Sequence, residues 1–375
     1  MIDITTERFF GGKASTVVGG GVVKQQALGE FEWQLCDITL DDGQTQTYQV
    51  VVGDAAHDVL HTPAGANAYV AHMDTLGEVH GTLQHGNATP MGAEQSNTSL
   101  IVGETIVKVF RKLERGLNPD VELLSQIENP HVAAVTGYVT LGEMTLAMQQ
   151  ERIDGADGFA LATAGMAPKR AGDLGAAIRS VHASLAETFG TVEVAAHDVR
   201  DTLNANLADY VRRAPVLQEY AEAISELYSA AFAGSSGGAE GGALQSMPTQ
   251  RVHGDLHLGQ TLQSRTADQR WYLIDFEGEP ARPLADRRRR DHPLRDVAGM
   301  VRSFGYAREV GRLDAQWESD AVSQLLAGYG DIDATLLKAY VADKAAYEVV
   351  YEANNRPDWV EIPLRAIRQL TGAIS

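Results

Sequence analysis

The fold is decided by Val252-His253-Gly254-Asp255-Leu256-His257-Leu258-Gly259-Gln260 and by Trp271-Tyr272-Leu273-Ile274-Asp275-Phe276-Glu277. In the first stretch, a loop, Asp255 is followed five residues later by the amide Gln260. The second is an apolar run, typical of a buried strand, that ends in the carboxylate of Asp275. Mg²⁺ prefers hard oxygen ligands, and phosphoryl transfer needs a carboxylate that orients the acceptor hydroxyl and takes its proton. Two acids and an amide on adjoining loops therefore indicate a magnesium-dependent phosphoryl-transfer site.

The order of these residues resembles that of the protein kinases. Asp255 and Gln260 are similar to the kinase catalytic loop, in which an Asp is followed by an Asn at the fifth position. Asp275 stands where the metal-binding Asp of the Asp-Phe-Gly motif would stand. The His-Gly-Asp opening resembles the aminoglycoside-phosphotransferase branch of that fold. The resemblance implies that Asp255 is the catalytic base and that Gln260 and Asp275 hold Mg²⁺.

A narrower resemblance rests on three blocks in order, from Gly254 to Gln260, from Asp275 to Pro280 and from Pro293 to Met300. Together they resemble the maltokinases and their close relatives, the glucosamine kinases. A non-catalytic sensor of sugar or nucleotide is the alternative of another class. Loss of a catalytic acid would favour that alternative, but both acids are present.

The composition excludes several classes of protein. The 375 residues are enough for two or three units with sizeable cores. A net charge of −19 argues against nucleic acid and against an anionic membrane surface as partners. Cys36 is the only cysteine, so no intramolecular disulfide forms. No apolar stretch approaches the ~20 residues of a transmembrane helix. We expect a cytoplasmic protein that is a monomer or a weak homodimer.

The sequence predicts an α+β, protein-kinase-like bilobal fold in three parts. Residues 1–90 form an α+β cap subdomain, 91–153 a β-rich N-lobe with a phosphate loop and a hinge, and 154–375 a helical C-lobe. A Gly- and Ser-rich segment at 234–242 reads as an exposed connection within the C-lobe.

The cap carries one motif, from Arg8 to Lys13. It resembles an N-terminal signature of the maltokinases, in which this unit caps the N-lobe. An ordinary turn, with glycines that permit unusual dihedral angles, explains the motif equally well.

A polar segment precedes a strand–turn–strand pattern at the start of the N-lobe. Its hydroxyl and amide groups are of the kind that lies along nucleotide phosphates. The resemblance identifies it as the ATP phosphate loop, with contacts from Ser96, Asn97, Thr98 and Ser99. It also identifies the segment from Met148 to Ile153 as the hinge that meets adenine, with Glu151 and Ile153 as ATP contacts.

Lys108 lies on the second strand of this pattern. A lysine in a strand is more often a surface or edge residue, but here it resembles the kinase lysine that contacts the α- and β-phosphates. Its expected partner is a glutamate on the next helix, which Asn118-Pro119-Asp120 is predicted to start. Glu122 is the predicted partner, and Glu128 is the alternative.

A long helix is predicted from about Ala334 to Asn354. One face mixes aromatic and hydrogen-bonding side chains at helical spacings, followed by a tryptophan: Lys344, Tyr347, Glu348, Tyr351, Asn355 and Trp359. The alternative is that the tyrosines pack in the core with satisfied hydroxyls. The resemblance to the substrate-binding end of maltokinase-like enzymes favours a sugar site. His257 and Glu277, close in sequence to the two acids, complete the predicted sugar-binding set.

The resemblance implies transfer of the γ-phosphoryl group of ATP to a sugar hydroxyl. Maltokinases tend to be longer, and an acid-rich pocket suits an ammonium group. We therefore expect glucosamine, phosphorylated on its 6-hydroxyl, as the substrate. Maltose, phosphorylated on its anomeric hydroxyl, is the alternative. The expected cofactor is Mg²⁺, and the expected partners are ATP and a small sugar.

Overall fold

The computed structural model describes residues 3–12, 15–53, 57–92, 96–233, 246–279 and 282–372. Lys13, Pro280 and the 234–242 segment, which enter the predictions above, lie outside these residues. The chain divides into two compact units. Unit 1 contains Met1–Glu128, Ala133–Ile153 and Arg282–Leu284, and unit 2 contains Asn129–Val132, Asp154–Ala281 and Ala285–Ser375. Sheets dominate the first unit and helices the second, so the predicted α+β class is confirmed.

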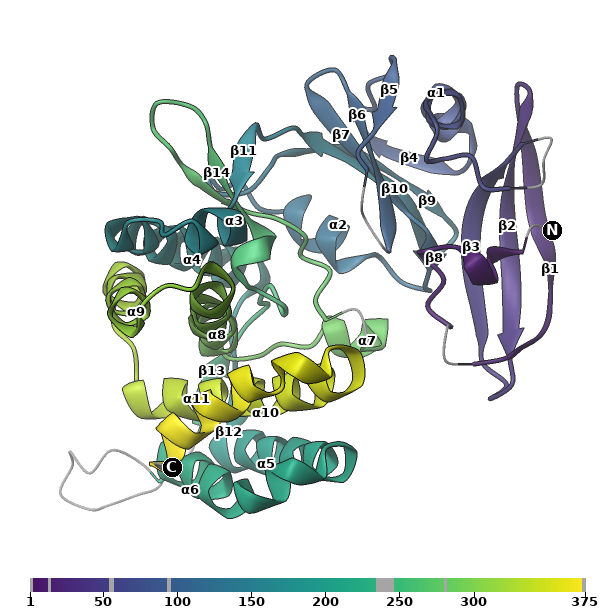
Figure 1. Ribbon diagram of the computed structural model, residues 1–375. Helices are drawn as coiled ribbons and strands as arrows, with labels where there is room; N and C mark the ends of the chain where they lie inside the picture. Colours follow the sequence, from purple (N-terminus) through teal and green to yellow (C-terminus); the bar gives the residue numbers. More distant parts are fainter. Residues whose placement is uncertain are drawn as a thin grey trace. The chain divides into compact units, whose positions relative to one another are not determined.

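Unit 1 is built on two antiparallel sheets (Figure 1). The four-stranded sheet has the order β1 (Val17–Leu28), β2 (Phe31–Leu40), β3 (Thr45–Val52), β8 (Lys112–Leu113). The six-stranded sheet has the order β4 (Glu78–Gly81), β9 (Val135–Leu141), β10 (Met144–Glu151), β7 (Thr105–Phe110), β6 (Asn97–Val102), β5 (Ala88–Pro90). The helical segments of the unit are η1 (Ile4–Thr6), α1 (Pro63–His72), η2 (Met73–Thr75) and α2 (Pro119–Leu124).

The regions predicted as cap and N-lobe share one hydrophobic core. Trp33 and Tyr69 from the first ninety residues pack in the same cluster as Val107 and Val109 of β7. The chain also passes directly from β7 in one sheet to β8 in the other, with a single residue, Arg111, between them. The two sheets are therefore joined by packing and by a continuous backbone.

Unit 2 is mainly helical. Its helices are α3 (Gly158–Thr163), α4 (Pro168–Phe189), α5 (Ala196–Arg213), α6 (Ala221–Ala231), α8 (Leu294–Gly311), α9 (Ala315–Tyr329), α10 (Ala334–Asn355) and α11 (Glu361–Thr371), with η3 (Pro215–Glu219), η4 (Leu258–Gln260) and η5 (Pro357–Trp359). The short α7 (Leu284–Arg287) begins at the last residue of unit 1. Two small sheets are formed by β11 (Gly155–Asp157), β14 (Thr261–Ser264) and β15 (Trp271–Leu273), and by β12 (Val192–Ala195) and β13 (Ser246–Thr249).

Helix α10 organises the core of unit 2. It contacts α5, α6, α8 and α11, which surround it in Figure 1. Asp333 begins the helix by accepting the amides of Thr335 and Leu336 at 2.9 and 3.0 Å, and Pro357 follows its end. The prediction of a long helix from about Ala334 is confirmed.

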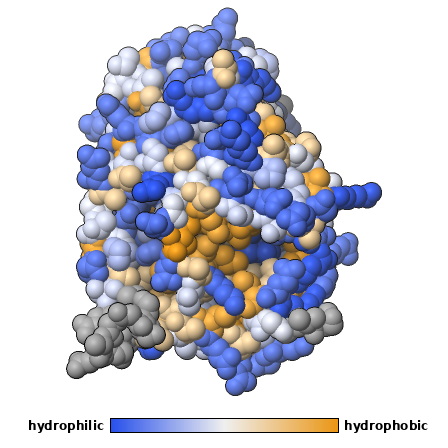
Figure 2. Space-filling model, turned by 90° about the vertical axis from the view of Figure 1, so that its left-hand side faces the viewer, coloured by the Kyte–Doolittle hydropathy of each residue, from blue (hydrophilic) through white to orange (hydrophobic). Residues whose placement is uncertain are grey.

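Figure 2 shows one face on which hydrophobic side chains gather near the centre, within a mainly hydrophilic surround. Among the described residues, no helix is both long enough and apolar enough to cross a bilayer.

His292 is a half-buried titratable group at the entry to α8. Its ring stacks on Tyr340 of α10 with centroids 6.1 Å apart, and its Nδ1 accepts the Leu294 amide at 3.2 Å. Burial lowers the pKa of His292 to about 4. The unfolded chain, in which the pKa of histidine is about 6.5, binds a proton that the folded protein excludes. Stability is therefore complete above about pH 6.5 and falls as the pH drops toward about 4.

We expect the free energy of unfolding to fall by about 2 kcal/mol between about pH 7 and about pH 5 because of His292. Urea unfolding at both pH values measures this difference. His292→Asn keeps an acceptor for the Leu294 amide but does not titrate, so its stability should depend less on pH. An equal acid sensitivity in both proteins would assign the effect to other groups.

Candidate active site

The predicted catalytic loop, between β13 and η4, is fixed by a buried carboxylate. Asp296, in the first turn of α8, accepts the amides of His253 and Gly254 at 2.8 and 2.9 Å and pairs with His182 Nε2 at 3.0 Å. Burial on its own raises the pKa of Asp296, but the bond from His182 and these amides hold that pKa below its usual range. Asp296 therefore stays ionised and fixes the backbone that carries Asp255.

The carboxylate of Asp255 contacts a lysine. Lys344 Nζ of α10 lies 3.2 Å from Asp255 Oδ1 and 3.2 Å from Glu279 Oε1. Arg295 contacts the same Glu279 oxygen at 3.2 Å. Burial lowers the pKa of Lys344, but Asp255 and Glu279 outweigh it and hold that pKa above its ordinary value. Lys344 and Arg295 thus already compensate part of the negative charge of Asp255 and Glu279. The sequence had suggested that such acidic charge attracts the ammonium group of the substrate.

Gln260 and Asp275, the predicted metal ligands, are in contact. Gln260 Nε2 donates to Asp275 Oδ2 at 3.0 Å, which leaves the amide oxygen Oε1 available. Asp275 has a φ of 65°, in the left-handed region that non-glycine residues rarely adopt. An amide oxygen and a carboxylate on adjoining segments are ligands of the kind that Mg²⁺ prefers, so these residues fit the ion.

His257 lies in the segment that carries Asp255 and Gln260, and Glu277 lies in the segment that carries Asp275. The Glu277 carbonyl accepts from Arg287 at 3.1 Å. His257 Nδ1 accepts the Gly259 amide at 3.1 Å at the start of η4, and burial lowers the pKa of its ring. His257 thus shapes the turn between Asp255 and Gln260, while sugar contacts by either residue remain a prediction.

The predicted sugar-binding face lies along α10. Next to Lys344, the Tyr347 ring centroid is 5.0 Å from Nζ, and the ring meets Tyr210 edge-on. Glu348 is buried and accepts from Arg302 Nε of α8 at 2.8 Å. Burial raises the pKa of Glu348, although Arg302 opposes that shift.

The face continues well beyond Lys344. Asn355 donates to the Tyr351 carbonyl at 2.8 Å, and the Trp359 ring in η5 stacks on Tyr306 with centroids 6.2 Å apart. An α-helix rises about 1.5 Å per residue, so about 16 Å separate the positions of Lys344 and Asn355 along the axis. The predicted set is therefore longer than one sugar ring.

The predicted nucleotide residues lie in unit 1. Lys108 of β7 is buried and donates to Asp120 Oδ2 at 2.8 Å. Asp120 was not among the acids expected to meet Lys108. A contact of Lys108 with Glu122, or with the alternative Glu128, stays a prediction. The helix α2 begins at Pro119, so Asp120 lies in its first turn and meets Lys108 there.

The predicted phosphate loop is partly a strand. Asn97, Thr98 and Ser99 open β6 and pair with β7, in register with Phe110, Val109 and Lys108. Ser96 is an exposed residue just before it. Strand pairing makes this segment regular, whereas its polarity indicated an open loop. The ATP contacts of these residues remain a prediction.

The predicted hinge begins in β10, an inner strand of the same sheet, and continues past the end of that strand. Glu151 ends β10, and its amide donates to the Ala134 carbonyl at 2.9 Å. Ile153 is the last residue of this part of unit 1. Contacts of either residue with adenine remain a prediction.

Sequence reasoning missed four residues that contact or support the site: Asp120, Arg295, Asp296 and Arg302. A signal existed for two of them, since Arg295 and Asp296 lie in the block from Pro293 to Met300 that carries the resemblance. Asp120 belongs to the motif Asn118-Pro119-Asp120, which was interpreted only as the start of a helix.

Comparisons with known proteins also point to sugar kinases. No family model matches the chain. A glucosamine kinase of Mycolicibacterium smegmatis is 26% identical over 359 residues, which cover 80% of this chain and 87% of that protein. A glucosamine kinase of Streptacidiphilus jiangxiensis is 29% identical over 224 residues, 52% of this chain and 47% of that protein.

Two solved structures show the fold. One is a glucosamine kinase in complex with glucosamine, ADP and inorganic phosphate, with a TM-score of 0.70, 22% identity and coverage of 96% of this chain and 95% of that one. The other is a GDP complex of an aminoglycoside 2'-phosphotransferase, with a TM-score of 0.50, 12% identity and coverage of 83% and 97%. The chain is thus similar in sequence to glucosamine kinases, and it shares its fold with a glucosamine kinase and an aminoglycoside phosphotransferase of known structure.

Proposed function

We propose that this protein is an ATP- and Mg²⁺-dependent kinase that transfers the γ-phosphoryl group to the 6-hydroxyl of glucosamine. The observation that carries the proposal is the setting of Asp255 in a homologue of the glucosamine kinases. Its loop is fixed by Asp296, and its carboxylate lies 3.2 Å from Lys344.

Asp255 acts as the base. A carboxylate within hydrogen-bond reach of the acceptor hydroxyl orients it and takes its proton as the phosphoryl group is transferred. Lys344 orients the carboxylate through its hydrogen bond to Oδ1. The bond from Lys344 to Glu279 in turn limits the movement of the lysine.

Gln260 and Asp275 would hold the metal. A bound Mg²⁺ neutralises charge on the nucleotide phosphates. The contact between Gln260 and Asp275 positions the two side chains relative to each other. In unit 1, Lys108 donates to Asp120 and is the residue that the resemblance assigns to the nucleotide phosphates.

Maltose is the second candidate substrate. The face from Lys344 to Trp359 is longer than a single pyranose, and a disaccharide would extend further along it. Aromatic rings such as Tyr351, which is 45% exposed, offer apolar surface for stacking against sugar rings.

An ATP-consumption assay with Mg²⁺ and a panel of glucosamine, glucose and maltose tests the proposal. We expect glucosamine to be the best substrate, and phosphorus NMR should locate the phosphate on the 6-hydroxyl. Faster turnover of maltose to a 1-phosphate would reverse the order of the two candidates. No turnover with any sugar, together with intact binding, would favour the non-catalytic sensor.

Two aromatic variants distinguish the ends of the α10 face. Glucosamine that meets Asp255 lies near Tyr347, so Tyr347→Ala should raise KM for glucosamine about tenfold, or about 1.4 kcal/mol. Trp359→Ala, a matched loss of an aromatic ring at the far end, should change that KM by less than about twofold. The KM for ATP serves as the control and should stay unchanged in both. Similar effects of both variants on the KM for glucosamine would extend the sugar site along the whole face.

A further inference from the structure

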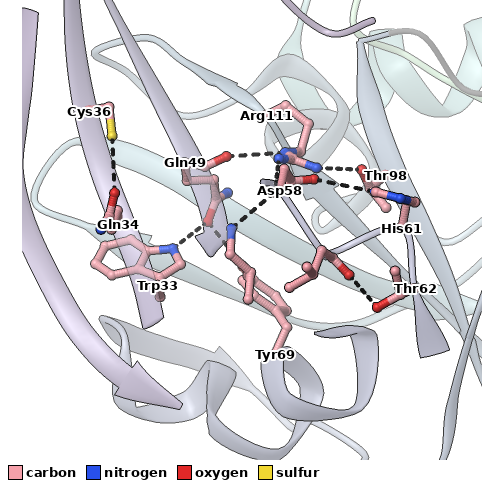
Figure 3. Close-up of polar contacts among 12 residues, drawn as sticks. Trp33, Gln34, Cys36, Gln49, Asp58, His61, Thr62, Tyr69, Thr98 and Arg111 are labelled. Carbon is pink, nitrogen blue, oxygen red and sulfur yellow. Dashed lines mark hydrogen bonds and ion pairs between the residues drawn. The ribbon is translucent and has the colours of Figure 1, made fainter. Parts of the chain in front are cut away.

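A buried arginine joins the two sheets of unit 1. Arg111 lies between β7 and β8 and is 1% exposed. Its Nε donates to the Gln49 carbonyl at 3.1 Å, one terminal nitrogen to Thr98 Oγ1 at 3.0 Å and the other to Asp58 Oδ1 at 2.6 Å (Figure 3). One guanidinium group thus contacts the four-stranded sheet, the segment before α1 and the strand β6.

The partners of Arg111 in the first ninety residues are fixed independently of it. Asp58 also accepts the Val51 amide at 3.0 Å, and the Phe9 ring centroid lies 3.9 Å from the guanidinium carbon. Burial raises the pKa of Asp58, but Arg111 and its other donors outweigh burial and hold that pKa below its usual value. The ion pair is therefore charged, buried and anchored on the side of the predicted cap.

A second buried side chain strengthens this anchor. Gln49 of β3 accepts from Trp33 Nε1 at 3.0 Å and from the Tyr69 hydroxyl at 3.3 Å (Figure 3). Its amide nitrogen donates to the carbonyls of Phe110 and Leu146 at 2.7 and 2.6 Å. The segment that leads into Arg111 is therefore tied to β3 and β10 on both sides.

Thr98 lies at the opposite end of the arginine. It belongs to the segment from Ser96 to Ser99 at the start of β6, and β6 pairs with β7, which carries Lys108. Both strands of the hairpin proposed to meet the nucleotide phosphates thus depend on Arg111. It continues β7 through the backbone and contacts β6 through Thr98.

We propose that Arg111 is a positioning residue through which Asp58 of the cap sets the affinity of the β6–β7 hairpin for Mg·ATP. The inference rests on the proposed function insofar as that hairpin binds ATP. A guanidinium that bonds to three fixed partners restricts the position of the Thr98 hydroxyl and of the strand that carries it. Loss of the contact at either end should then leave the hairpin less ordered and nucleotide binding weaker.

Calorimetric titration with Mg·ATP, without any sugar, tests the inference. Thr98→Val removes the acceptor at the hairpin end, and Asp58→Asn removes the charge at the cap end. Each should raise the Kd for Mg·ATP about fivefold, within the range that substitutions in coupling networks produce.

The double variant separates positioning from direct contact. If Asp58 acts through Arg111 and Thr98, adding Asp58→Asn to Thr98→Val should not weaken binding further. Effects that multiply to about 25-fold would mean that the two residues act independently, and would overturn the inference. Tyr69→Phe, which removes a hydroxyl from the same network on the far side of Gln49, should lower the melting temperature and leave Kd unchanged.

The outcomes also separate this inference from the proposed function. A wild-type protein that binds Mg·ATP but phosphorylates no sugar would contradict the function alone. An active kinase whose Asp58→Asn and Thr98→Val variants are less stable yet bind Mg·ATP normally would contradict the inference alone, and would leave Arg111 a purely structural residue.

Discussion

Asp255→Asn should lower kcat by about 100- to 10,000-fold, because general-base catalysis commonly supplies a factor of that size. The amide keeps the shape of the side chain and an oxygen that accepts from Lys344, but it does not take a proton from the acceptor hydroxyl. The fold and the affinity for Mg·ATP should stay close to those of the wild type, since Asp296 and not Asp255 fixes the loop. Steady-state kinetics with the preferred sugar measures the loss.

Asp268→Asn is a matched control for this variant. Asp268 lies in an exposed turn between β14 and β15, where it accepts from Thr266 and Arg270. The same chemical change there should leave kcat unaffected. Turnover of Asp255→Asn within a fewfold of the wild type would remove Asp255 from the role of base.

Asp275→Asn should weaken Mg·ATP binding by more than about tenfold, since even groups that only support metal ligands cost about 10- to 100-fold. The substitution removes one negative charge and keeps a similar shape next to Gln260. Calorimetry with Mg·ATP measures the change, and the affinity for glucosamine should be nearly constant.

A titration with ATP and a chelator in place of Mg²⁺ provides the control. Without the metal, wild type and Asp275→Asn should bind ATP with similar affinity, because the carboxylate is proposed to act on the nucleotide through the ion. A difference that persists without Mg²⁺ would place Asp275 against the nucleotide itself. Unchanged Mg·ATP affinity would contradict the assignment of Asp275 as a metal ligand.

The sequence predicted those features that depend on short segments. The α+β class, the strand before Asp275 and the helix α10 each follow from hydrophobic periodicity or from a cap, and these signals lie within a few residues. The neighbourhood of Asp255 and Gln260 also follows from one loop. The structure agrees with the prediction of the class, of that strand and of that helix, and it brings Gln260 into contact with Asp275.

The contacts that the sequence did not predict are set by geometry between elements. The contact of Lys108 with Asp120 depends on how α2 is rotated against β7, which no local pattern in the sequence determines. The contact between Lys344 and Asp255 joins positions far apart in the chain, so no local sequence pattern predicts it. The role proposed for Arg111 was not predicted either, because a single arginine after a strand is typical of an ordinary surface residue.

The left-handed backbone of Asp275 has a consequence for laboratory evolution of this protein. The left-handed conformation costs most residues with a Cβ atom roughly 1–2 kcal/mol and costs Asp less, whereas glycine adopts it freely. Selection for heat resistance alone would therefore reward replacement of Asp275 by glycine and would remove the carboxylate proposed to hold the metal. Natural proteins commonly keep such locally unfavourable residues at functional positions, and a stabilised library of this enzyme should be screened for turnover at the same time as for melting temperature.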